Sequence, residues 1–194
     1  MIRKAVHTDS QAIANLMMQA MAEVVSKLTG SADPYSELAF LEHFIRLPDN
    51  QYSYQNTLVF EDNYRICGSL TAYDGASLHT LRQPILDYLN LRGIAAENIE
   101  GETAGGEFYI DTIGVSPDKQ GHGIGTQLLE AGIQTGIALG HRHIGLLVNP
   151  DNPKAKKFYE RMGFKEKGVR PFLNIAYIHM VFEADYAAEK RQTD

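Results

Sequence analysis

The stretch that decides the fold runs from residue 115 to residue 129 and reads VSPDKQGHGIGTQLL. An apolar, strand-like run ends at Val115, and a helical pattern of apolar residues follows the loop. Between them stand Gly121, Gly123 and Gly125, although glycine loses the most entropy on folding and is about 1 kcal/mol worse than alanine in a helix. One glycine would suit a turn, whereas three at alternate positions need another explanation.

That explanation is anion binding at the start of a helix. A helix N-terminus carries unpaired N–H groups and a partial positive charge, which together form a natural phosphate site. Glycines let a phosphate approach the backbone, and their left-handed conformations turn successive N–H groups inward. The order strand, glycine loop, helix therefore predicts a phosphate cradle.

Two common nucleotide motifs do not fit this loop. A P-loop needs Lys and then Ser or Thr after its last glycine, whereas Thr126 and Gln127 follow Gly125. The dinucleotide fingerprint needs a glycine where Thr126 stands. ATP and NAD are therefore weak alternatives as ligands.

The loop resembles motif A of the GNAT superfamily of N-acetyltransferases, read here as Q-x-x-G-x-G over Gln120, Gly123 and Gly125. Residues 146–164, LLVNPDNPKAKKFYERMGF, resemble motif B of that family, with an Asn, an Ala, a Phe-Tyr pair and a terminal Gly-Phe. The resemblance covers residues 107–182 and includes one variation, since position 120 is more often Arg in the family.

The resemblance implies an α/β (α+β) fold: a mixed, mostly antiparallel central sheet flanked by helices, with a splayed cleft between the fourth and fifth strands. Acetyl-CoA would lie in the cleft without a metal, its diphosphate on the N–H groups of the glycine loop and its pantetheine arm along a strand end. The implied cofactor-binding residues are Ile113, Gly114, Val115, Gln120, Gly121, His122, Gly123, Ile124, Gly125, Thr126, Asn149, Asn152 and Ala155.

The segment after the next strand has consistent helix signals. Asn152 suits the N-cap, Pro153 the first helical position and Gly163 the left-handed position after the helix. Tyr159 falls on the apolar stripe and faces inward. The resemblance implies that Tyr159 points at the thioester sulfur as a general acid; a core tyrosine with a satisfied hydroxyl is the alternative.

The general base is expected on the strand EFYIDTIGV, residues 107–115. Alternation places Glu107, Tyr109 and Asp111 on one face, unless a bulge reverses it. Some family members carry a glutamate where Tyr109 stands, so that role cannot be transferred. Asp111, nearest the cleft, is the first choice and Glu107 the second, with solvated strand-edge carboxylates as the alternative reading.

The rest of the chain is expected to form one domain over residues 1–194. The expected strands are 1–6, a hairpin over 56–75 that turns at 61–63, 107–115, 143–148 and a long last strand, 173–183. The expected helices are 11–28, 34–47, 78–93, 124–140 and 152–164. Capping is expected from Thr8 with Gln11 in the first helix, and from Thr80, with Pro84 in the first turn, in the third.

Residues 76–106 read as an insertion that shapes the acceptor site together with the helix over 34–47, because cleft loops commonly carry specificity. Its candidate polar contacts are Tyr73, His79 and Arg82.

Composition limits the other possibilities. A single cysteine, Cys67, excludes an intrachain disulfide and a Cys-based zinc site.

The start of the sequence lacks a secretory signal pattern and no apolar run suits a membrane span, so we expect a cytoplasmic protein without a membrane partner. A net charge of −6 argues against nucleic acid and favours a cationic acceptor. Oligomeric state is not readable, and a homodimer stays open.

The sequence therefore predicts an N-acetyltransferase that moves an acetyl group from acetyl-CoA to a primary amine of a small molecule or peptide by direct attack. Two alternatives from other classes stay open: a non-catalytic acyl-CoA sensor, and an interaction module on the same fold.

Overall fold

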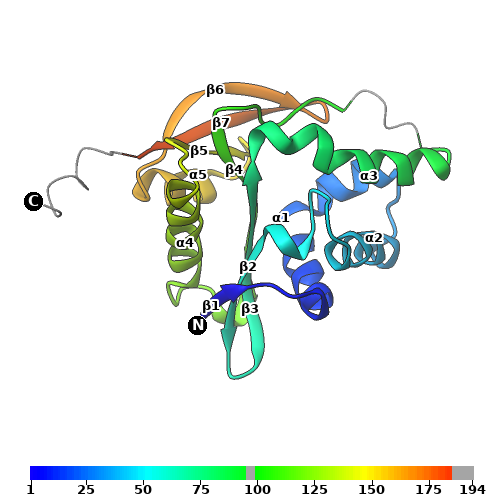
Figure 1. The fold of residues 1–194 in the computed structure, drawn as a ribbon, viewed down its shortest axis with the longest axis horizontal. Coiled ribbons are helices and arrows are strands. Elements are labelled where there is room, and N and C mark those ends of the chain that lie inside the picture. Colours follow the sequence, from blue (N-terminus) through cyan, green and yellow to red (C-terminus); the bar gives the residue numbers. More distant parts are fainter. Residues whose placement is uncertain (95–98, 185–194) are drawn as a thin grey trace, which may run out of the picture.

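A computed structural model describes residues 1–94 and 99–184. Its seven strands form one sheet in the order β1-β2-β3-β4-β5-β7-β6, in which only the β4–β5 pair is parallel (Figure 1). The strands are β1 Ile2–Lys4, β2 Thr57–Asp62, β3 Arg65–Asp74, β4 Glu107–Val115, β5 His143–Val148, β6 Lys165–Phe172 and β7 Ile175–Glu183. The predicted mixed, mostly antiparallel sheet is confirmed.

Helices cover both faces of the sheet, with α1, α2 and α3 on one side and α4 and α5 on the other (Figure 1). The helices are α1 Ser10–Thr29, α2 Pro34–Arg46, α3 Leu78–Leu91, α4 Ile124–Ala138 and α5 Pro153–Arg161. Short 3₁₀ turns lie at His7–Asp9, Tyr54–Asn56, Gly75–Ser77 and Pro117–Lys119. No helix in the described residues has the length and apolar character to cross a membrane.

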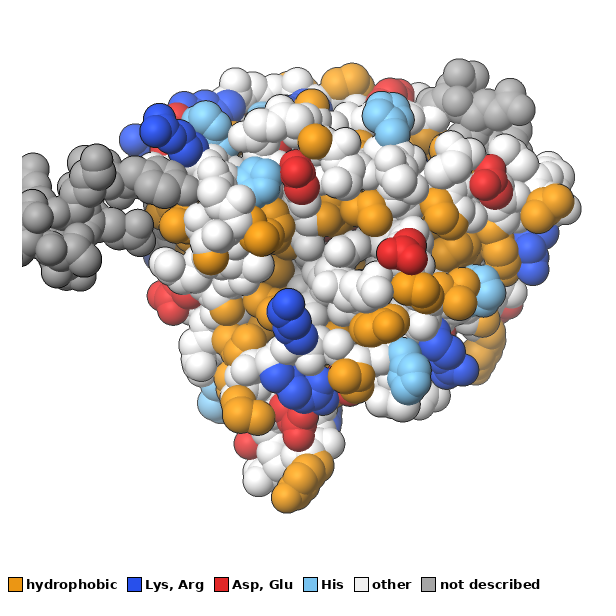
Figure 2. All heavy atoms as spheres, viewed as in Figure 1, with side chains coloured by type: hydrophobic (Ala, Val, Ile, Leu, Met, Phe, Trp, Pro, Cys, Tyr) orange, Lys and Arg blue, Asp and Glu red, His pale blue; other side chains and the backbone are white. Residues whose placement is uncertain are grey.

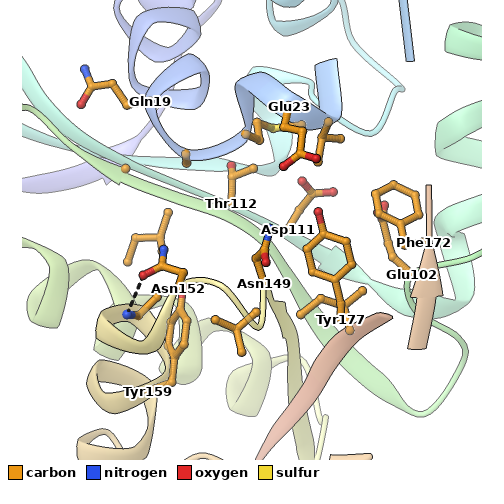
Figure 3. A pocket seen from close by; sticks show the side chains of 18 of the residues that line it. Gln19, Glu23, Glu102, Asp111, Thr112, Asn149, Asn152, Tyr159, Phe172 and Tyr177 are labelled. Carbon is orange, nitrogen blue, oxygen red and sulfur yellow. Dashed lines mark hydrogen bonds between the residues drawn. The ribbon is translucent and has the colours of Figure 1, made fainter. Parts of the chain in front are cut away.

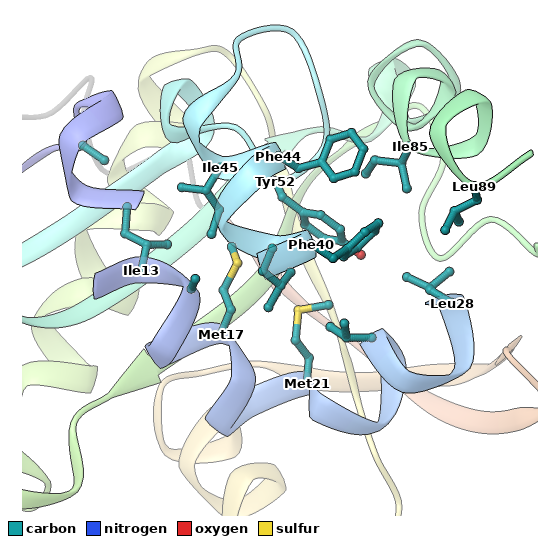
Figure 4. Packing of buried hydrophobic residues seen from close by; sticks show 14 of the residues in the cluster. Ile13, Met17, Met21, Leu28, Phe40, Phe44, Ile45, Tyr52, Ile85 and Leu89 are labelled. Carbon is teal, nitrogen blue, oxygen red and sulfur yellow. The ribbon is translucent and has the colours of Figure 1, made fainter. Parts of the chain in front are cut away.

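The three helices on the first side share a buried apolar core (Figure 4). Met17 of α1, Phe44 of α2 and Leu89 of α3 are each at most 2% exposed within it. Full burial of such a side chain stabilises the fold by about 1.5–3 kcal/mol. This packing fixes α3, and with it the start of the chain segment that leads into β4.

Strand β4 is the element that opens the sheet. It pairs with β3 as far as Val115 but with β5 only as far as Ile110. A bulge lies between these points, because Ile110 faces Ala72 of β3 while Thr112 faces Thr71, which leaves Asp111 as the extra residue. Beyond Ile110 the β5-facing backbone edge of β4 is therefore unpaired, and the predicted opening between the fourth and fifth strands is confirmed.

Two predictions about helix starts are wrong. Helix α1 begins at Ser10, and no side chain of Thr8 caps it; instead the Asp9 carboxylate accepts hydrogen bonds from the Val6 N–H at 2.9 Å and from Arg3. Helix α3 begins at Leu78 directly after a 3₁₀ turn, so Pro84 lies in its interior. The apolar stripe of α3 is buried against the first core, which outweighs the unfavourable proline.

The predicted last strand, 173–183, is found as β7, which begins at Ile175, but the strand before it, β6, was not predicted. Leu173 and Asn174, with φ of 50° and 64°, form a tight turn between β6 and β7. Strand β6 is almost fully exposed and polar and ends the sheet, so it has no apolar alternation to mark it. The β2–β3 turn likewise centres on Asn63 and Tyr64, slightly later than predicted.

Side chains of all kinds are interspersed on the face seen in Figure 2, where lysine and arginine stand in small groups among acidic and apolar residues.

Candidate active site

A cavity of about 360 Å³ lies where β4 and β5 separate (Figure 3). Its walls come from α1, β4, β5 and α5, from the loop that precedes the 3₁₀ turn before β2, and from the turn end of the β6–β7 hairpin. The lining residues are Gln19, Ala20, Met21, Glu23, Val24, Tyr52, Glu102, Tyr109, Asp111, Thr112, Ile113, Gly114, Val115, Gln120, Leu147, Val148, Asn149, Asn152, Ala155, Tyr159, Phe172 and Tyr177.

The glycine loop forms an exposed shelf next to this cavity, which reaches Gln120 but not the loop itself. Gly121 and Gly123 both have φ of 79°, a left-handed conformation that favours glycine. The first helical donor is the Gln127 N–H, which binds the Gly123 carbonyl at 3.1 Å. Within the described chain the amides of residues 121–126 have no hydrogen-bond partner. These residues fit a diphosphate group.

Four further residues of the loop and of the first turn of α4 complete this shelf. The His122 ring folds back onto the loop, with Nδ1 at 3.0 Å from the Gln120 carbonyl, while Ile124 is buried under the helix start. Gly125 and Thr126 are half-buried in the first turn of α4. The backbone of the loop, more than its side chains, is thus turned to solvent.

The open edge of β4 provides the second part of a cofactor site. Ile113, Gly114 and Val115 line the cavity and have no β5 partner. A Cβ at Gly114 would lie 2.7 Å from the Leu16 carbonyl oxygen, so only glycine lets α1 approach β4 here. The Gln120 side chain donates to the Val115 carbonyl at 3.1 Å and therefore points to β4 instead of the loop.

Helix α5 borders the cavity on the β5 side, and its predicted caps are confirmed. Asn152 Oδ1 accepts from the Ala155 N–H at 3.0 Å, and Asn149 Oδ1 accepts from the Asp151 N–H at 2.9 Å. Tyr159 rises from α5 into the cavity and is 9% exposed (Figure 3). Burial raises the pKa of Tyr159 to about 12, which keeps the phenol protonated at neutral pH.

The opposite end of the cavity holds a buried hydrogen-bond network. Gln51 Nε2 donates to Glu102 Oε1 at 2.5 Å and to Asp111 Oδ2 at 2.7 Å. The Tyr73 hydroxyl donates to the same Asp111 oxygen at 2.8 Å, and Arg82 Nη2 donates to Glu102 Oε1 at 2.5 Å. Segments far apart in the sequence thus meet around two carboxylates that both line the cavity.

The environment of these carboxylates favours a shared proton. Burial raises the pKa of Glu102 to about 7, the charge of Asp111 adds to the rise, and Arg82 opposes it. Burial also raises the pKa of Asp111, against the hydrogen bonds from Gln51 and Tyr73 and the charge of Arg82. Such groups titrate as a pair, so near neutral pH the pair can accept a proton.

The bulge gives the cavity a further polar group. Asp111 and the following Thr112 both line it, and Thr112 is 7% exposed. Among the residues that the structure describes, Thr112 Oγ1 has no hydrogen-bond partner. A buried hydroxyl without a hydrogen bond costs about 1–3 kcal/mol of stability. A ligand or water atom that formed a hydrogen bond with Thr112 Oγ1 would remove this cost.

Glu107, the second choice for the base, lies elsewhere. It lines a separate cavity of about 340 Å³, whereas Asp111 lines the first cavity, and the bulge at Asp111 breaks the alternation from which a shared face was predicted. Thr103 donates to Oε1 at 2.6 Å and His179 lies 2.8 Å from Oε2, with Arg170 at 3.1 Å from Oε1. Burial opposes ionisation of Glu107, but the contacts with His179, Thr103 and Arg170 outweigh it and lower its pKa.

Of the three residues predicted to contact the acceptor, two lie at the cavity end that holds Asp111 and one does not. Tyr73 and Arg82 join the network around Asp111, whereas His79 is exposed on α3 and does not line the cavity. Helix α2 contributes no lining residue among those described, and its place is taken by α1. Residues 95–98 of the predicted insertion lie outside the described chain. Glu102 was not predicted, because its acidic, glycine-rich segment has no periodic pattern.

No group of three or more His, Cys, Asp or Glu side chains within residues 1–94 and 99–184 is placed to hold a metal ion.

Comparisons with known proteins agree with this geometry. The sequence model of the Acetyltransferase (GNAT) family matches residues 22–164. A mycothiol acetyltransferase of Geodermatophilus obscurus is 41% identical over 70 residues, which cover 36% of this chain and 22% of that protein. The chain thus spans about a fifth of the length of the curated relatives it matches first.

Solved structures match nearly the whole chain. A crystal structure of an acetyltransferase is 30% identical, with a TM-score of 0.78, and covers 95% of this chain and 100% of its own. An N-acetyltransferase from Staphylococcus aureus Mu50 is 22% identical, with a TM-score of 0.78 over 93% of this chain and 99% of its own. The second likeness concerns the fold alone.

Proposed function

The chain belongs to the Acetyltransferase (GNAT) family, and from this premise we propose that it transfers an acetyl group from acetyl-CoA to a primary amine. One observation carries the proposal: the unpaired edge of β4, next to the unpartnered amides of residues 121–126, opens into a cavity with Asp111 at one end and Tyr159 at the other. Donor, acceptor and proton-transfer groups would thus meet in one space.

The acyl donor would be held mostly by backbone atoms. The amides of residues 121–126 would bind its diphosphate, supported by the positive end of α4. The free N–H and C=O groups of residues 113–115 would pair with the amides of its pantetheine arm, as an added strand would. Acetyl-CoA would supply an activated thioester carbonyl to the cavity.

The acceptor nitrogen must be neutral to attack this carbonyl. A lysine-type amine with a pKa near 10.4 is neutral only about once in 2,500 molecules at pH 7. Attack forms the N–C bond, breaks the C–S bond and releases one proton from the nitrogen. Asp111, in its pair with Glu102, is the proposed acceptor of that proton, because both carboxylates line the cavity.

Tyr159 is the proposed donor to the departing sulfur. Because burial places its pKa well above that of a free thiol, complete proton transfer would be uphill, contrary to the near balance expected from reference values. A hydrogen bond from the phenol to the developing thiolate is the role that this environment favours.

The test is an acceptor screen with acetyl-CoA that follows free thiol, with the acetylated product identified by mass spectrometry. We expect turnover of at least one primary amine, and a loss of about 100-fold or more in kcat/KM for Asp111→Asn. Asp87→Asn, at an exposed carboxylate on α3, is the matched control. Calorimetric binding of coenzyme A without turnover of any amine would instead support an acyl-CoA sensor.

The other expectations from the sequence stay predictions. They are a cytoplasmic location, no nucleic-acid or membrane partner, and a homodimer as an open alternative.

A further inference from the structure

The acceptor end of the cavity carries more negative charge than the reaction needs. Glu23, Glu102 and Asp111 line it, and none of the described lining residues is Lys, Arg or His. Arg82, behind the wall, offsets Glu102. Asp111 is required for the amine proton, so Glu23 is a carboxylate without a role in the chemistry.

Glu23 lies at the mouth of the cavity on α1. Its ion pair is with Lys27, one turn further along the helix, at 2.9 Å, with the two side chains 59% and 37% exposed. Such exposed pairs are weak and easily exchanged. In Figure 3 the Glu23 and Asp111 carboxylates and the Tyr177 hydroxyl point toward the same space. Tyr177 lies within electrostatic reach of both Glu23 and Glu102.

Two independent features of the wall suit a cation. The rings of Tyr109, Phe172 and Tyr177 line the acceptor end, and aromatic faces attract ammonium groups. Thr112 lines the cavity beside Asp111, and its Oγ1, buried and unpartnered among the described residues, has the capacity to accept a hydrogen bond from an ammonium or amine N–H.

We propose that the acceptor is an alkyl diamine, acetylated on the nitrogen beside Asp111 while its second, protonated nitrogen is held between Glu23 and Tyr177. The inference rests on the proposed function. The reacting nitrogen gives its proton to Asp111, forms the N–C bond and displaces the thiolate, so it cannot also balance Glu23. A second positive charge on the same molecule can take the place of the exposed Lys27 beside Glu23, whereas a carboxylate there would be repelled.

Three acceptors of equal chain length test this: butanediamine, butylamine and aminobutyrate, which end in ammonium, methyl and carboxylate. We expect kcat/KM for butanediamine to exceed that for butylamine by about tenfold and that for aminobutyrate by more. Glu23→Gln should lower the ratio of butanediamine to butylamine about fivefold. Glu130→Gln, at an exposed position of α4 outside the cavity, should leave the ratio unchanged.

Equal kcat/KM for butanediamine and butylamine, or a ratio that Glu23→Gln does not move, would overturn the diamine assignment. Turnover of other amines would then leave the acetyltransferase proposal intact, so the two failures are distinguishable. Calorimetry of butanediamine and butylamine with the coenzyme A complex gives a readout besides turnover: tighter binding of the diamine is expected, and equal or absent binding of both contradicts the inference.

Discussion

Glu102 and Asp111 accept hydrogen bonds from one nitrogen, Gln51 Nε2, at 2.5 and 2.7 Å, although Glu102 precedes β4 and Asp111 stands at its bulge. Neither carboxylate can ionise freely, because Glu102 is buried, Asp111 is half-buried, and the two lie close to one another. A proton bound by this carboxylate pair would lie at the end of the cavity where we place the acceptor amine.

The first prediction concerns the pH dependence of turnover. Because Glu102 has its pKa raised to about 7 and Asp111 is raised as well, the pair is protonated below neutral pH and accepts a proton above it. We expect kcat/KM to rise as pH increases through about 7, and Glu102→Gln to move this acidic limb to lower pH. If Glu102→Gln leaves the acidic limb at the same pH, the limb belongs to another group. Glu130→Gln is the control and should leave the pH profile unchanged.

The second prediction concerns stability. The folded pKa of Glu102 lies above its usual value of 4.5, so between these values the folded state binds more protons than the unfolded state. The contribution of Glu102 to the free energy of unfolding therefore falls as pH rises from about 4.5 to about 7, by up to about 3 kcal/mol. Urea unfolding at pH 5 and pH 8 should show this decrease in the wild type and a smaller one in Glu102→Gln; equal decreases would contradict it.

The third prediction separates catalysis from binding at Tyr159. Phe at this position keeps the ring packing but removes the hydroxyl, so we expect kcat to fall about 100-fold while the Kd for coenzyme A changes less than about twofold. Thiol release and calorimetry give the two values. Tyr64→Phe, at a 99% exposed turn position, is the matched control. Unchanged kcat in Tyr159→Phe would leave the phenol as a packing residue only.

The fourth prediction compares two glycines with similar backbones. Gly121 and Gly140 have φ of 79° and 90°, and a Cβ at either would meet no atom within 4 Å. Alanine at either site should therefore cost similar stability, about 1–2 kcal/mol. Only Gly121→Ala should weaken coenzyme A binding, by about tenfold, because only Gly121 lies in the loop. Equal affinity of both variants would remove the loop from the cofactor site.

Local chemistry allowed much of the fold to be predicted. Strands β4 and β5 have the predicted bounds, and α5 has its predicted cap at Asn152 and left-handed Gly163. In each case the apolar pattern of the segment and the residues at its two ends indicate the same element. The glycine loop was predictable for a similar reason, because its conformation depends on the residues within it.

Tertiary context decided the rest. Strand β6 carries charges on an exposed sheet edge, and α3 tolerates Pro84 because its apolar stripe is buried. Glu102 enters the site only because Gln51 and Arg82, from distant segments, meet it. No local pattern marks such contacts, nor the bulge that exposes Thr112 to the cavity.

The most direct test of the central claim follows backbone amide signals by NMR as coenzyme A is added. The account predicts that the amides of residues 121–126 shift with coenzyme A but not with pantetheine, which lacks phosphates, while those of residues 113–115 shift with both. Shifts elsewhere in the chain, with the amides of residues 121–126 unmoved by coenzyme A, would contradict it.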